Sequence, residues 1–115
     1  MRAVAFAWGP VALWVAVLFL LSSSSGLSGP NLFAHEDKVA HLGLYALLGA
    51  VFAHARGVSQ ARGLWAPPAI SLIVLAALIG VLDEWVQSTV PGRTPSAADW
   101  AADVAGILLG FAMLT

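Results

Sequence analysis

Long apolar stretches alternate with short polar ones along this chain, and this alternation predicts helices that cross a membrane. The first apolar run occupies residues 3–21 and contains no charged side chain. A helix of that length, rising about 1.5 Å per residue, matches the hydrocarbon core of a bilayer. Similar runs follow, and we expect further spans at residues 38–55, 66–87 and 97–114.

Turn and capping residues set the expected ends of these helices. Residues 56–62 carry two arginines and predict a short basic connection after the second helix. Pro67 and Pro68 fit the first turn of the third helix, where a missing backbone N–H costs nothing. Ser96 and Asp99 have the spacing of a capping box and predict the start of the fourth helix.

A cleavable signal peptide is the alternative interpretation of the first apolar run. A single arginine precedes the run and four small residues, Ser22–Ser25, follow it. Signal peptides usually have an apolar core of about 7–15 residues, and this run is longer. Its length therefore favours a helix that stays in the membrane.

Composition supports the same class of protein. The chain has 115 residues, of which 60% are hydrophobic and only 10% are charged, whereas a soluble domain carries about 25% charged residues. We therefore predict a single-domain, all-α integral membrane protein, a bundle of four transmembrane helices. The absence of cysteine excludes disulfides and thiolate metal sites. With a formal net charge of −1 and no basic stripe, nothing indicates a nucleic-acid partner.

The basic residues predict the orientation in the membrane. Arg2, Arg56 and Arg62 fall on one side of the four-span arrangement, and Lys38 and Arg93 fall on the other. Arginine and lysine are enriched in cytoplasmic loops. We therefore predict a multi-pass protein with both termini in the cytoplasm.

Polar side chains recur at helical spacing near one expected end of three helices. The candidate ligand-binding or catalytic residues are Asp37, Lys38, His41 and Tyr45 on the second helix, Asp83, Glu84 and Gln87 on the third, Arg93 in the connection, and Ser96, Asp99 and Asp103 at the fourth. Residues three or four apart share a helix face, and polar faces in lipid turn toward each other. We predict one shared site at the extracytoplasmic end. Further along the fourth helix, Gly106 and Gly110 predict close helix packing.

The charge of this cluster restricts what it can do. Its five carboxylates and two cations leave a formal charge of −3 when His41 is neutral. Buried like charges close to one another do not all stay ionised. The cluster therefore requires protons, a charged histidine, a bound divalent cation or contact with water. The simpler alternatives are Asp99 as a helix cap, and Asp103 or Asp83 paired with Arg93 as a structural clasp between helices.

Two kinds of chemistry fit these residues. Lys38 and Arg93 could clamp the phosphate or carboxylate of a headgroup, with His41 and Tyr45 orienting it. Alternatively, His41 with Glu84 or Asp83 could perform acid–base catalysis. No H-E-x-x-H or G-x-S-x-G motif occurs, so neither a zinc protease nor a serine hydrolase of that kind is supported.

Taken together, these motifs resemble the VanZ-like family over about residues 35–111. The motifs read Asp37-Lys38-x-x-His41-x-x-x-Tyr45, Asp83-Glu84-x-x-Gln87, Pro91-Gly92-Arg93 and Ser96-x-x-Asp99-x-x-x-Asp103-x-x-Gly106-x-x-x-Gly110. Asp103 is a departure, since the family more often has asparagine there. The resemblance implies a small protein of the bacterial plasma membrane with a role in the cell envelope. The founding member is associated with resistance to the glycopeptide teicoplanin.

Three hypotheses about function follow. In the first, the site binds or handles a cell-envelope component, an anionic lipid headgroup or a cell-wall precursor. In the second, the protein is a membrane hydrolase or transferase acting on a lipid-linked substrate, with a divalent cation as a candidate cofactor. In the third, the polar network only holds the helices together.

Overall fold

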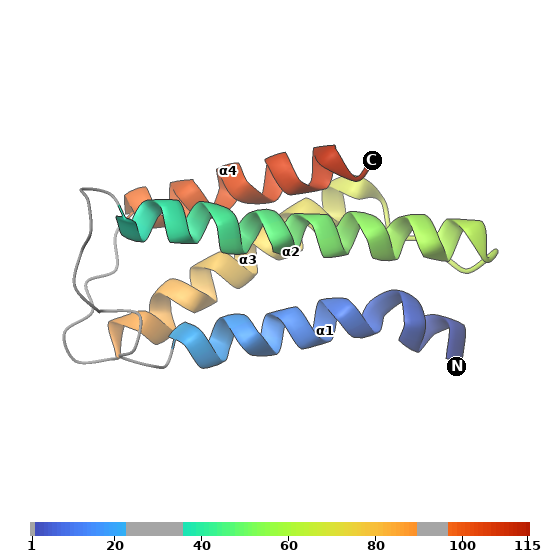
Figure 1. The fold of residues 1–115 in the computed structure, drawn as a ribbon, viewed down its shortest axis with the longest axis horizontal. Coiled ribbons are helices and arrows are strands. Elements are labelled where there is room, and N and C mark those ends of the chain that lie inside the picture. Colours follow the sequence, from blue (N-terminus) through green and yellow to red (C-terminus); the bar gives the residue numbers. More distant parts are fainter. Residues whose placement is uncertain (1, 23–35, 90–96) are drawn as a thin grey trace.

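The apolar runs fold into four α-helices. A computed structural model describes residues 2–22, 36–89 and 97–115, and these ranges contain no β-strand. The helices are α1 (Arg2–Ser22), α2 (Glu36–Ala61), α3 (Ala69–Ser88) and α4 (Ala97–Met113). They run up and down in an elongated bundle measuring 46 × 24 × 21 Å (Figure 1).

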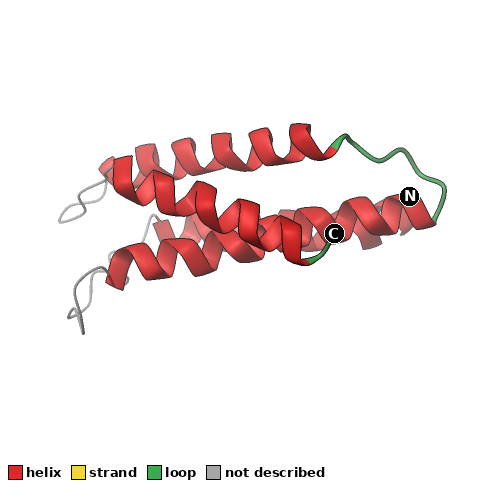
Figure 2. Cartoon of the chain, turned by 90° about the horizontal axis from the view of Figure 1, so that it is seen from above, coloured by secondary structure: helices red, strands yellow, loops and turns green. Residues whose placement is uncertain are grey.

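The up-and-down order brings particular helix ends together. The last turns of α1 and α3 lie at the same end of the bundle as the first turns of α2 and α4 (Figure 1). The connection between α2 and α3 lies at the opposite end (Figure 2). Helices α2 and α4 therefore run in the same direction, and the expected site residues on three helices come to one end.

Three of the helices are long and apolar enough to cross a membrane: Arg2–Leu21, Val39–Ala61 and Ala69–Ser88. Large apolar side chains such as Phe6, Leu78 and Leu109 project outward from the bundle, where lipid would cover them. The protein is thus an all-α membrane protein. The shorter α4 has 17 residues and carries two buried aspartates.

Helix α2 is longer than the sequence predicted, because residues 56–61 continue it. Gly57 alone does not break a helix, and no proline occurs between residues 36 and 66. The helix ends at Ala61, and Gly63 just beyond it has a φ of 69°. There the Gly63 N–H donates to Gln60 O and the Leu64 N–H to Ser59 O, which is the pair of hydrogen bonds of a Schellman motif.

Helix α3 begins later than the sequence predicted. Pro68 precedes the helix as its N-cap, with φ −57° and ψ 144°. Both prolines were expected inside the first turn. Since a residue before proline avoids the helical conformation, Pro67 cannot easily be helical. The Pro68 carbonyl instead accepts hydrogen bonds from the Ser71 N–H and hydroxyl.

Helices α2 and α3 each contact the other three helices, and the most extensive contact between described helices is that of α2 with α4. Glycines make the α2–α4 contact close enough for backbone to touch backbone. A Cβ at Gly106 would overlap the Leu42 carbonyl, and one at Gly110 would overlap that of Ala46. From the α2 side, Gly49 meets Ile107 in the same way. We call this contact the glycine seam.

Two tryptophans attach α1 to α2. The indole N–H of Trp14 donates to the Leu44 carbonyl at 2.9 Å, and that of Trp8 to the Ser59 hydroxyl at 3.1 Å. The ring of Trp8 also packs edge-on against Phe52. These bonds fix α1 against the face of α2 that carries Tyr45 and Leu48, both of which are buried.

Candidate functional site

The buried faces of three helices carry polar side chains at the same end of the bundle. His41 and Tyr45 lie four residues apart on α2, so they share one face. The buried polar residues of the other two helices are Asp83 and Gln87 on α3 and Asp99 and Asp103 on α4. Together with Glu84, they form what we call the polar cluster.

A short contact joins His41 to Asp103 and thus α2 to α4. His41 Nδ1 lies 2.6 Å from Asp103 Oδ1. Asp103 is completely buried, and the His41 side chain is 10% exposed. When Nδ1 carries the proton, it donates to the carboxylate, and this charge-assisted bond fixes the orientation of the ring.

A second contact joins α2 to α3. The Tyr45 hydroxyl donates to Asp83 Oδ2 at 2.6 Å, and both side chains are buried. The rings of His41 and Tyr45 stack nearly parallel, with centroids 6.5 Å apart. The two α2 side chains therefore support each other while each binds a carboxylate from a different helix.

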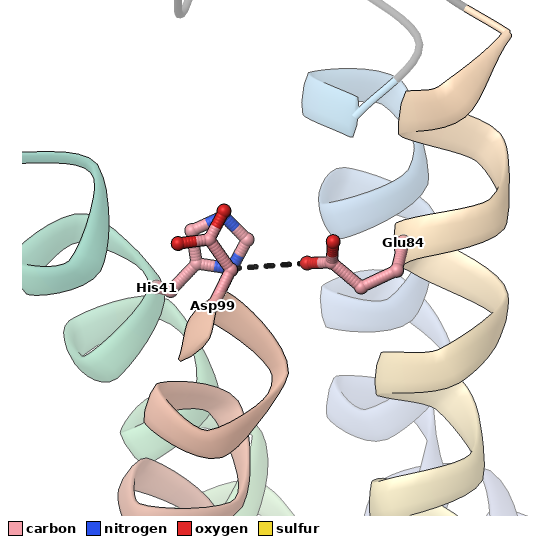
Figure 3. Close-up of side chains that lie close together, drawn as sticks. All are labelled: His41, Glu84 and Asp99. Carbon is pink, nitrogen blue, oxygen red and sulfur yellow. Dashed lines mark ion pairs between the residues drawn. The ribbon is translucent and has the colours of Figure 1, made fainter. Parts of the chain in front are cut away.

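Glu84 and Asp99 complete the polar cluster. Glu84 Oε1 lies 3.9 Å from His41 Nδ1, and the Glu84 side chain is 13% exposed. Figure 3 shows the Glu84 carboxylate pointing from α3 toward His41 and Asp99. Asp99 is buried in the first turn of α4. Of the four acidic side chains in the polar cluster, that of Glu84 is the most exposed, while its Oε1 is buried.

The polar cluster contains two overlapping sets of atoms that could hold a metal ion. One set comes from His41, Glu84 and Asp99, and the other from His41, Asp83 and Asp103. Within each set the nitrogen or oxygen atoms lie within 4.8 Å of one another. Imidazole and carboxylate are ligands for divalent metals such as zinc and manganese.

One carboxylate oxygen of the polar cluster lacks a hydrogen bond. Asp103 Oδ2 is buried and has no hydrogen-bond partner among the residues that the structure describes. It faces α3 at Gly80, lying 3.5 Å from where a Cβ on that glycine would be. Beside it, the Trp100 indole N–H donates to the Ala77 carbonyl. Asp103 thus presents an oxygen toward the space between α4 and α3.

The polar cluster is strongly acidic. Asp83, Glu84, Asp99 and Asp103 bring a formal charge of −4, with His41 as the basic group among them. Such a charge is unstable in an apolar bundle unless protons or cations compensate for it.

Several predicted site residues cannot be placed in the polar cluster. Asp37 and Lys38 belong to α2, but their side chains lie outside the described residues. Arg93 and Ser96 also lie outside the described residues, so the expected clasp between Arg93 and a carboxylate falls there too.

Sequence reasoning missed three small residues that matter for the site or for the packing of the helices. Gly49 belongs to the glycine seam, Gly80 faces Asp103, and Ser59 accepts the hydrogen bond from Trp8. Gly80 could have been found, because it lies three residues before Asp83 on the same helix face. Gly49 stands in an apolar run without a motif, and Ser59 stands in the stretch that was expected to be a basic connection. Only the packing of the helices reveals their roles.

Comparison with known protein families gives a match over almost the whole chain. The family model described as VanZ/LLP1 matches residues 7–115, almost the whole chain. Searches of curated proteins and of solved structures give no match.

Proposed function

The chain belongs to the VanZ-like family, and from that premise we propose that its polar cluster binds the headgroup of a cell-envelope lipid or cell-wall precursor. The observation that carries the proposal is the buried pair of His41 and Asp103, with three more carboxylates around it at one end of a membrane bundle. Ionisable groups inside a membrane are expensive and are usually retained for function.

The chemistry of the polar cluster suits groups that donate hydrogen bonds. Ionised carboxylates only accept hydrogen bonds, so they would bind the hydroxyl or amine groups of sugar, glycerol or peptide headgroups. Glu84 has the most exposed of these acidic side chains and would make the first contact. Lys38 and Arg93 would bind the anionic part of the same headgroup.

The proposal includes a position in the membrane. We place the protein in the bacterial plasma membrane with α4 as a fourth span, both termini in the cytoplasm and the polar cluster on the outer side. Arg56 and Arg62, near the end of α2 far from the polar cluster, favour that orientation. On this side the protein would meet cell-wall precursors, in keeping with a role in glycopeptide resistance.

Binding to lipid nanodiscs tests the proposal. Purified protein should bind phosphatidylglycerol or a lipid-linked cell-wall precursor, and Glu84→Gln, Lys38→Ala and Arg93→Ala should each weaken this binding. His54→Gln is the control, because His54 is exposed far along α2 from His41. Unchanged binding in both Lys38→Ala and Arg93→Ala would refute their assigned role, and unchanged binding in all three variants would refute the site.

Acid–base catalysis is the second candidate function, favoured by the 2.6 Å contact between His41 and Asp103. A carboxylate that orients an imidazole is a common arrangement around a general base. Glu84→Gln should then abolish turnover of a lipid-linked substrate while the headgroup still binds. If alanine substitutions in the polar cluster only lower thermal stability together, the network is structural and both candidates are wrong.

A further inference from the structure

The acidic polar cluster has the ligands for a metal ion. We propose that His41, Asp83 and Asp103 bind a divalent transition metal, manganese or zinc, with Glu84 and Asp99 on the outer side of the ion.

The distances suit a common ion. The candidate ligand atoms of His41, Asp83 and Asp103 all lie within 4.8 Å of one another. Zinc binds nitrogen and oxygen ligands at about 2.0–2.2 Å in tetrahedral geometry, so two ligands of one ion are separated by roughly 3.4 Å. Side-chain adjustments of up to about 1 Å would bring the three atoms to bonding distance.

The hydrogen bonding of Asp103 points to a ligand independently of the spacing. Asp103 is fully buried, and its Oδ2 has no hydrogen-bond partner within the described ranges. A buried carboxylate oxygen without a partner is unfavourable. This oxygen faces Gly80, one turn before Asp83 on the same face of α3. A cation between α4 and α3 would satisfy it.

The surroundings of the ligands also suit a metal site. The Tyr45 hydroxyl donates to Asp83 Oδ2 and so fixes the direction of that carboxylate. Residues that hold metal ligands in place in this way commonly change metal affinity about 10- to 100-fold when mutated. The histidine selects the class of metal, because magnesium and calcium prefer ligand sets made of oxygen alone.

A bound divalent cation would lower the formal charge of the polar cluster from −4 to −2. It would also offer a phosphate a direct ligand position on the outer side. This last step rests on the proposed headgroup binding, whereas the metal site itself does not.

The test uses full-length protein in detergent, stripped with a chelator and free of added lipid. Manganese binding is followed by electron paramagnetic resonance, and zinc by its displacement of manganese. We expect a single saturable site per chain. Binding should be lost in His41→Gln and Asp103→Asn, weakened about 10- to 100-fold in Tyr45→Phe, and unchanged in His54→Gln.

Each outcome decides the proposal. No saturable binding by the wild type, or full binding in Asp103→Asn and His41→Gln, would overturn it. If those two variants fail to fold, the manganese affinity of Tyr45→Phe decides the proposal, because that change leaves every proposed ligand in place. Metal binding without lipid binding in nanodiscs would refute only the proposed function, and lipid binding without metal binding would refute only the metal site.

Discussion

At the scale of single residues, His41 is the side chain on which the polar cluster depends. Its Nδ1 lies within reach of carboxylates from two other helices, Asp103 at 2.6 Å and Glu84 at 3.9 Å. Its ring stacks on Tyr45, which binds Asp83. Replacing His41 therefore affects contacts with both α3 and α4.

A double-mutant cycle should reveal strong coupling between His41 and Asp103. We expect a favourable coupling of about 1–2 kcal/mol, at the upper end for membrane proteins, because the pair is buried and charge-assisted. The measurement is the free energy of unfolding in mixed micelles for His41→Ala, Asp103→Ala and the double variant. Additive effects would show that the short contact contributes no net stability.

At the scale of helices, the glycine seam explains why α2 and α4 lie so close. Gly106 and Gly110 on α4 and Gly49 on α2 let the backbones touch. The seam continues along α2 and α4 from the pair of His41 and Asp103. Close packing there therefore sets the short distance between those two side chains.

Gly110→Ala should destabilise the bundle. The added methyl group would overlap the Ala46 carbonyl, and overpacking of this kind commonly costs about 1–3 kcal/mol. Gly43→Ala is the control on α2, since a Cβ at Gly43 meets no atom within 4 Å. Unfolding in mixed micelles should separate the two variants. Equal free energies of unfolding for the two variants would mean that the glycine seam accommodates the added methyl group without cost.

The end of α2 supplies a second prediction at this scale. Gly63→Ala places a side chain at a φ of 69° and should cost about 1 kcal/mol of stability. Gly57→Ala, at an exposed position with open space around its Cβ, should be neutral or stabilising. Thermal unfolding of the two variants measures the difference, and equal melting temperatures would contradict the strain at Gly63.

At the scale of the whole molecule, the proposed topology can be tested by labelling. The chain has no native cysteine, so single cysteines can be introduced at exposed Ser88, Gln60 and Thr115. A membrane-impermeant maleimide should label Ser88→Cys in intact cells and the other two only after permeabilisation. Labelling of Thr115→Cys in intact cells would show that α4 does not cross the membrane.

One sequence predicts the features that are set by residues close together in the chain, and misses those set by residues far apart in it. Uncharged runs such as residues 3–21 predicted helices, because length and hydropathy are local properties. The expected end of the second helix at residue 55 was wrong, because the position of the helix C-terminus depends on the left-handed conformation of Gly63. Spacing could place His41 and Tyr45 on one face, but their partners lie 62 and 38 residues away. Only the packing of the helices selects those partners.

The shared direction of α2 and α4 has an electrostatic consequence. The glycine seam joins two helices whose N-terminal ends point the same way, and each end carries a partial positive charge of about half an electron. Asp99, in the first turn of α4, lies where that field favours an anion. Glu84 lies near the C-terminal end of α3, where the field has the opposite sign and favours a cation. The peptide backbone thus polarises the space between Glu84 and Asp99 before any ligand arrives.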